Sequence, residues 1–188
     1  MALTYSNSKI HPHKFALWLG CGGIVMMFAA WTSAFVVRHA AGNWLEYKLP
    51  NIFYYNTITI ILSSVTLQLS YNAFKKRNEN VYKSLLIITF VLGILFIVFQ
   101  VIGWQQLSDI GVPLKKNPSG DFIYLFTTFH VAHLMAGLGI LIVALVHAFG
   151  LPFKPTPRRQ LRFELTLTYW HFVDLLWVYL LLFIYSQS

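Results

Sequence analysis

The chain has 188 residues, of which 57% are hydrophobic and 11% are charged, and its formal net charge is +8. Charged residues usually make up about a quarter of a soluble domain, so this composition excludes a soluble globular protein and predicts an all-α integral membrane protein. No segment outside the apolar runs is long enough to fold alone, which argues against a domain for a soluble substrate. The basic residues are divided among short loops, a distribution that membrane topology explains better than a nucleic-acid-binding groove.

Five apolar runs are long enough to cross a bilayer, which takes roughly 20 residues for about 30 Å of hydrocarbon. They cover residues 15–37, 53–74, 84–107, 122–149 and 163–186. The first run is too long, and lies too far from the N-terminus, to be a cleaved signal peptide, so we expect it to be retained. We therefore expect a single transmembrane domain over residues 1–188, built as a bundle of five helices.

The basic residues predict the orientation of the chain. If the N-terminus shares one side with the second and fourth loops, that side holds ten of the 14 lysines and arginines. These are Lys9, Lys14, Lys75, Lys76, Arg77, Lys83, Lys154, Arg158, Arg159 and Arg162, while the other side holds Arg38, Lys48, Lys115 and Lys116. The positive-inside rule places the ten in the cytoplasm, so we expect the N-terminus inside and the C-terminus outside.

Small residues and capping residues are found in the first and fourth spans. Glycines predict close helix approach, a main source of association energy in lipid; they are Gly22, Gly23, Gly137 and Gly139. Ser119 or Asp121 is expected to cap the fourth helix.

The fourth span contains two histidines, His130 and His133, three residues apart on one helix face. A metal or a haem would need further ligands at the same depth. This span has no carboxylate beyond Asp121, and the other mid-membrane histidine is His171. We therefore expect no metal and no cofactor in this chain.

The fifth span carries polar residues inside an apolar segment, where ionisable groups are rare and normally face other protein. Four of them, separated by four, three and three positions, lie along one helix face: Glu164, Thr168, His171 and Asp174. Counted from opposite ends of their helices, His133 and Asp174 each lie about 17 Å into the membrane, so we expect a polar cluster between the fourth and fifth helices. Such a cluster is a neutral hydrogen-bonded pair, an ion pair or one end of a proton relay. We favour a structural lock, because one intramembrane carboxylate does not make a proton pathway.

These residues also form recognisable patterns. The run Y-W-H-F-V-D-L-L-W at 169–177, with Phe163 and Glu164 upstream, closely resembles the last helix of subunit III of the haem-copper terminal oxidases. Three other spans carry patterns similar to that family's, in the same order along the chain. They comprise Asn56, Thr57, Leu62, Ser63, Ser64 and Thr66 in the second span, Gly93, Phe96, Gln100 and Trp104 in the third, and Thr127, Phe129, His130, His133 and Gly137 in the fourth.

The chain departs from the family pattern in two ways. Ile24 and Gly103 stand where the family commonly has glutamate, so a role for those carboxylates is not carried over. Five spans also resemble the shorter bacterial form of the subunit, which lacks the first two of seven helices.

The resemblance implies a subunit without a redox centre, docked on the catalytic subunit I, with subunit II alongside, in a proton-pumping oxygen reductase of a bacterial cytoplasmic membrane. Haem and copper would belong to those partner subunits. This chain would stabilise subunit I, support its proton uptake and bind structural phospholipid. We expect lipid headgroups at the basic residues between the fourth and fifth spans: Lys154, Arg158, Arg159 and Arg162.

Three other functions remain as alternatives. The accessory membrane protein of nitric oxide reductases shares the fold and much of the motif set. A membrane cytochrome b is disfavoured by the histidines, and a proton-coupled transporter by the lack of an inverted repeat. The sequence does not identify the electron donor of the oxidase, because cytochrome c or quinol would react with other subunits.

Overall fold

The computed structural model describes residues 11–42, 44–45, 47–154 and 156–187, and it is all-helical over these residues, as predicted. Five helices follow one another along the chain: α1 (Pro12–Ala40), α2 (Ile52–Lys75), α3 (Glu79–Asp109), α4 (Pro118–Gly150) and α5 (Pro157–Gln187). All five are long and apolar enough to cross a membrane. Each extends past the predicted apolar run by a few residues, because polar end residues continue the helix into the interfacial region.

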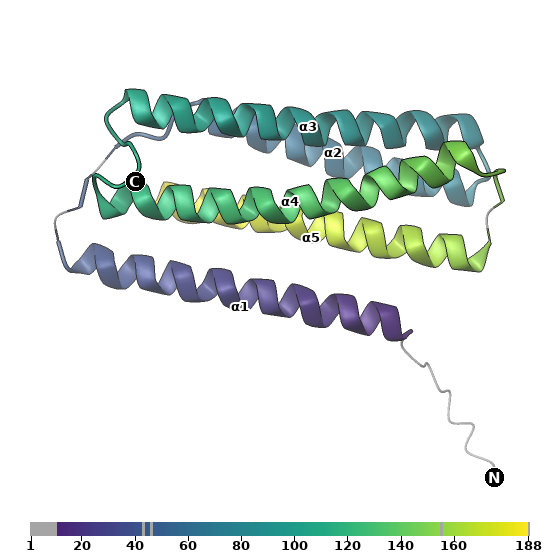
Figure 1. Ribbon diagram of the computed structural model, residues 1–188, viewed down its shortest axis with the longest axis horizontal. Coiled ribbons are helices and arrows are strands. Elements are labelled where there is room, and N and C mark those ends of the chain that lie inside the picture. Colours follow the sequence, from purple (N-terminus) through teal and green to yellow (C-terminus); the bar gives the residue numbers. More distant parts are fainter. Residues whose placement is uncertain (1–10, 43, 46, 155, 188) are drawn as a thin grey trace, which may run out of the picture.

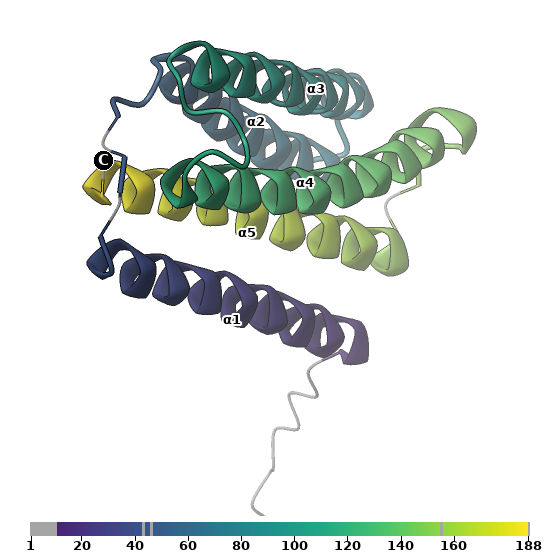
Figure 2. The same cartoon turned by 60° about the vertical axis from the view of Figure 1, so that its left-hand side comes forward.

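The helices run up and down along one common direction (Figure 1). α2 and α3 form one pair, α4 and α5 lie beside them, and α1 is the outermost helix (Figures 1 and 2). α5 contacts α1, α2 and α4, whereas α1 packs only against α4 and α5 among the described segments. The core of the protein is therefore the four-helix unit α2 to α5, in which each helix contacts two others, and α1 packs on its α4–α5 side.

Asparagines start two of the helices. The side chain of Asn117 accepts a hydrogen bond from the Ser119 backbone at the start of α4, and Asn78 accepts one from Val81 at the start of α3. The prediction that Ser119 or Asp121 caps α4 is therefore wrong. The Ser119 hydroxyl instead donates to the Leu45 carbonyl, and Asp121 accepts from the Lys115 backbone, so both residues hold neighbouring loops against the helix.

Two glycines make room for one tryptophan of α5. A Cβ atom built on Gly93 of α3 would lie 3.0 Å from the Trp170 ring, and one built on Gly137 of α4 would lie 3.2 Å from it. The indole thus fills the space that two glycines leave open, and its Nε1 donates to Ser63 Oγ of α2 at 2.9 Å. Trp170 joins three helices to α5.

The other glycines at which close helix approach was predicted have no such neighbour. Gly22 and Gly23 of α1 and Gly139 of α4 have no atoms of other segments within 4 Å of a built Cβ. The prediction of close approach is confirmed at Gly137 alone, because only there does a large ring from another helix need the room.

The start of α1, the α2–α3 turn and the α4–α5 loop lie at one end of the bundle (Figure 1). Nine of the ten basic residues grouped by the orientation prediction are in described segments, and Lys9 lies outside them. We call this the basic end; the opposite end carries the α1–α2 and α3–α4 connections.

Candidate functional site

The polar residues of α5 face α2, and the expected packing of this face on α4 is wrong. His171 makes a short hydrogen bond through Nδ1 to Ser64 Oγ, and its Nε2 lies 3.2 Å from Gln68 Oε1. Both partners belong to α2. Spacing along a single helix places residues on one face but does not say which neighbour covers that face, and here the serine and glutamine of α2 cover it.

Asp174 lies one turn further along α5 and is 5% exposed. Neither carboxylate oxygen has a hydrogen-bond partner among the described residues. Ser64 of α2 lies close to this carboxyl group, but its hydroxyl is engaged by His171. Burial of a carboxyl group without a partner is costly, so Asp174 is the least satisfied polar side chain of α5.

The two histidines of α4 occupy separate environments. His130 is fully buried, and its ring lies 5.0 Å from Trp177 and 5.7 Å from Phe96 between ring centroids, with both nitrogens unpartnered among the described residues. His133 is half-buried, and its Nδ1 lies 2.7 Å from the Phe129 carbonyl of its own helix. The expected pair of His133 with Asp174 is therefore not formed.

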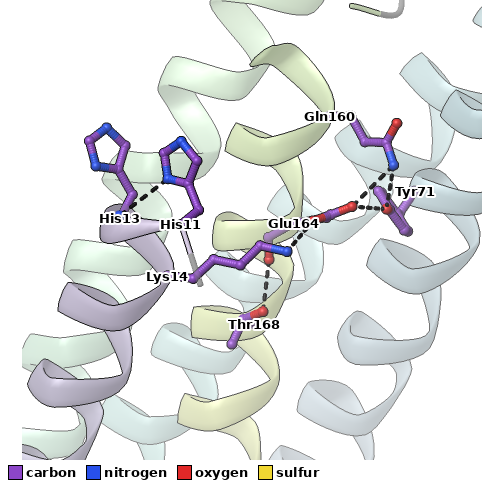
Figure 3. A network of polar contacts seen from close by, with 7 residues as sticks. All are labelled: His11, His13, Lys14, Tyr71, Gln160, Glu164 and Thr168. Carbon is purple, nitrogen blue, oxygen red and sulfur yellow. Dashed lines mark hydrogen bonds and ion pairs between the residues drawn. The ribbon is translucent and has the colours of Figure 1, made fainter. Parts of the chain in front are cut away.

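Glu164 is the centre of a polar junction at the basic end (Figure 3). Its Oε2 lies 2.8 Å from Lys14 Nζ of α1, and its Oε1 accepts hydrogen bonds from Tyr71 of α2 at 2.7 Å and from Gln160 of α5 at 3.1 Å. Thr168 donates to the Glu164 backbone carbonyl and so serves its own helix. One carboxylate therefore joins three helices, and a charged acceptor strengthens each of these hydrogen bonds.

Sequence reasoning missed the partners of Glu164. Lys14 was assigned to topology, while Tyr71 and Gln160 were not singled out. A usable signal was present for Gln160, which precedes Glu164 by four residues and so lies on the same helix face.

Sequence reasoning also missed how tryptophans tie α5 to α2. Trp170 donates to Ser63, and Trp177 donates to Thr57 Oγ1 at 3.0 Å. The two tryptophans are seven residues apart, which is two helical turns, and the hydroxyl residues lie six apart on α2. Thr57 and Ser63 of the second-span pattern are thus hydrogen-bond acceptors for indole groups.

A third interhelical polar contact joins α2 to α3. Asn56 Nδ2 donates to Gln100 Oε1 at 2.9 Å, and both residues are buried. These residues belong to the two motifs that resemble the oxidase family in the second and third spans, so the motif positions meet in space.

The two positions where the chain departs from the family pattern, Gly103 and Ile24, are packed against apolar side chains. Gly103 leaves room for Ile52 and Phe53 of α2, which lie 3.2 and 3.3 Å from a Cβ built there. Ile24 of α1 packs against the hydrophobic core. Both sites are apolar in this chain and provide no substitute carboxylate.

No group of three or more His, Cys, Asp or Glu residues is arranged to hold a metal within the described ranges. His130, His133 and His171 have different partners: aromatic rings, a backbone carbonyl, and α2 side chains respectively. The residues present are arranged for packing and hydrogen bonding between helices.

A cavity of about 600 Å³ opens at the basic end between α4 and α5. Its walls are mainly apolar, with Val143 of α4, Phe163 of α5 and Leu17 of α1 among the lining residues, and the arginines Arg159 and Arg162 at its border. The combination of an apolar interior with cations at the border suits an amphipathic anion.

The four basic residues expected at lipid headgroups are not equivalent. Arg159 is half-buried and donates to the Pro152 carbonyl at 2.7 Å. Lys154, Arg158 and Arg162 are exposed, and of these three Arg162 borders the cavity.

Comparison with known proteins places these features in a family. The model of a family described as cytochrome c oxidase subunit III matches residues 45–188. A probable cytochrome c oxidase subunit 3 of Mycobacterium tuberculosis is 30% identical over 97% of this chain and 94% of its own length. The cytochrome c oxidase subunit 3 of Corynebacterium diphtheriae is also 30% identical, over 77% of this chain and 71% of its length. That of Rattus norvegicus is 30% identical over 69% of this chain and 48% of its length.

Proposed function

Because this chain belongs to the cytochrome c oxidase subunit III family, we propose that it is the non-redox subunit III of a proton-pumping oxygen reductase in the aerobic respiratory chain. As a family member it is a multi-pass membrane protein and a subunit of an oxidoreductase complex. In our proposal it docks on subunit I, with subunit II in the same complex, and lies in a bacterial cytoplasmic membrane. Haem and copper belong to the partner subunits, and this chain stabilises subunit I and supports its proton uptake.

The observation that supports a structural role most is the use of the family motif in α5. Trp170, His171 and Trp177 all bond to side chains of α2. Side chains committed to such contacts fix the helix positions, and in lipid the interhelical contacts are a main source of association energy. The subunit therefore acts on its partners through the shape and surface of a rigid bundle.

Co-purification tests the proposed complex. The chain is solubilised with a mild detergent from its own membranes through an affinity tag, and the haem-containing polypeptide that accompanies it is identified by mass spectrometry and by its visible absorption spectrum. We expect an oxygen-reducing haem-copper subunit I. Recovery of a nitric oxide reductase instead would replace the proposal with the alternative function.

We also propose that the cavity at the basic end holds an acyl chain of an anionic phospholipid, with the phosphate at the arginines. The volume of about 600 Å³ lies within the usual range for ligand sites, roughly 300–1,000 Å³, and its border carries Arg159 and Arg162. A cytoplasmic-leaflet phosphate would gain about 1 kcal/mol from each nearby basic residue.

Native mass spectrometry measures the lipid directly. We expect the double variant Arg159→Glu with Arg162→Glu, which changes the two arginines that line the cavity, to retain less anionic lipid than the wild type. The matched control is Lys48→Glu with Lys116→Glu, which reverses two charges at the opposite end of the bundle. Equal lipid retention by both variants would leave the arginines as orientation signals only.

The orientation of the chain is part of the same proposal. The basic end faces the cytoplasm, so the N-terminus is inside and the C-terminus outside. With Cys21 replaced by alanine, a cysteine at position 116 should react with a membrane-impermeant maleimide in intact spheroplasts, whereas a cysteine at position 76 should react only after lysis. The reverse pattern would contradict the orientation.

A further inference from the structure

The outermost helix, α1, is attached unevenly along its length. The stripe of α1 that faces the bundle repeats every seven residues, which keeps these residues close to one helix face; it consists of the half-buried Lys14 and the buried Cys21, Phe28 and Phe35. Phe28 and Phe35 are 1% and 3% exposed. The stripe therefore changes from large rings in the second half of the helix to a small thiol and a charged group in the first half.

The second half is held by aromatic packing. The Phe35 ring lies 5.2 Å from Phe183 of α5 and 5.4 Å from Phe122 of α4 between centroids. Nearby, the hydroxyls of Thr32 and Tyr179 lie 3.2 Å apart. Aromatic rings contribute large buried areas, so this end of α1 is anchored.

The first half packs against the bundle through smaller and fewer side chains: Cys21 is buried, Ile24 packs against the core, and Leu17 lines the cavity. Gly20, Gly22 and Gly23 surround Cys21, and none of them has another segment within 4 Å of a built Cβ. Beyond this packing, the first half is attached to the bundle by the contact of Lys14 with Glu164, at 2.8 Å. It is the one ion pair between helices in the described part of the chain, because the other pair, Glu79 with Lys83, lies within α3.

Glu164 is held ready for Lys14 by the rest of the bundle. Tyr71 and Gln160 both donate to Oε1, which leaves Oε2 directed at the lysine (Figure 3). The acceptor is thus fixed by α2 and α5, while the donor is on a long side chain of α1 that is 42% exposed.

We propose that the Lys14–Glu164 pair is a clasp that holds the first half of α1 against α5, and that α1 swings away about its aromatic anchor when the pair is broken. Leu17 lies one turn after Lys14 and forms part of the cavity wall. Opening the clasp removes that wall and gives the cavity a sideways entrance from the membrane.

Cys21 reports the movement, because it is the single cysteine of the chain and is 5% exposed in the seam between α1 and the bundle. The measurement is the rate at which N-ethylmaleimide modifies Cys21 in the full chain in its membranes, followed by mass spectrometry of this chain. A buried thiol reacts only when the segment opens, so the rate reports the open population. We expect Glu164→Gln to raise the rate by about two- to fivefold, the range for a partly exposed ion pair.

Two further variants separate the clasp from general loosening. Lys14→Met removes the pair from the α1 side without disturbing Tyr71 or Gln160, and it should raise the rate by a similar factor. Glu79→Gln removes the ion pair within α3 and should leave the rate at the wild-type value.

The exchange of the two charges gives a third check. The double variant Lys14→Glu with Glu164→Lys restores an ion pair and should bring the rate back toward the wild type. Wild-type rates in both Glu164→Gln and Lys14→Met would overturn the proposal, and so would an equal increase in Glu79→Gln.

Discussion

A methyl group added at Gly93 should destabilise the bundle, because the space is already occupied. A Cβ built there lies 2.8 Å from Leu138 Cδ2 and 3.0 Å from Trp170. The leucine end could rotate, but the indole is confined by Gly137 on its other side and by its hydrogen bond to Ser63. The Gly93→Ala variant must therefore rotate Leu138 and displace the confined indole by a few tenths of an ångström.

The size of the effect follows from two opposing terms. Overpacking a filled core typically costs about 1–3 kcal/mol, whereas alanine in place of glycine favours a helix by about 1 kcal/mol. Gly139→Ala is the matched control, because it lies on the same helix as Gly137 and has open space around its Cβ. Gly139→Ala gains the helix preference of alanine without the cost of overpacking, whereas Gly93→Ala has both. The helix preference cancels in the comparison, so the two variants should differ in unfolding free energy by about 1–3 kcal/mol.

Thermal unfolding of the purified chain in detergent measures this difference. For a chain of this length each kcal/mol shifts the melting temperature by about 2–4 °C, so Gly93→Ala should melt clearly below Gly139→Ala. Equal melting temperatures would show that the Trp170 site yields without cost, and the reasoning from the close contacts would be refuted.

Three other outcomes are expected. Asp174→Asn should assemble and support near-normal oxidase turnover at all pH values, because the carboxyl group has no hydrogen bond to lose; turnover that fails most at high pH would instead assign Asp174 a role in proton transfer. The purified chain should contain no stoichiometric haem or copper by absorption and metal analysis, and a metal that His133→Ala removes would contradict this. Ser63→Ala should lower the unfolding free energy by about 1–3 kcal/mol, because it leaves the buried Trp170 N–H without an acceptor, and an unchanged melting temperature would contradict that assignment.

Much of the fold could be predicted from the chain alone, because the bilayer imposes simple rules on sequence. Each span had to be apolar over the membrane thickness and had to satisfy its backbone internally as a helix. The five predicted runs accordingly lie within the five observed helices. The motif around Tyr169 to Trp177 was specific enough to indicate the family that the comparisons confirm.

The partners of the polar residues needed the tertiary structure. The spacing from Glu164 to Asp174 defines a face of α5, but the same spacing is compatible with α2 or α4 as the neighbour, and the predicted one was wrong. Depth in the membrane also does not predict which residues make contact, since His133 and Asp174 lie at similar calculated depths without forming a pair. Whether two side chains on neighbouring helices touch depends on how each helix is rotated about its axis as well as on depth in the membrane. The sequence of one span does not determine how that helix is rotated within the bundle.

The sequence by itself thus determined that this protein is a bundle of five membrane helices with its polar residues inside, because hydrophobic length and helical periodicity act within each segment. Only the tertiary structure decided that Trp170 sits between Gly93 and Gly137, and that Lys14 reaches Glu164 across 150 residues of chain. Those contacts join segments far apart in sequence, and they depend on how side-chain volumes and hydrogen-bonding groups from several helices fit together at once.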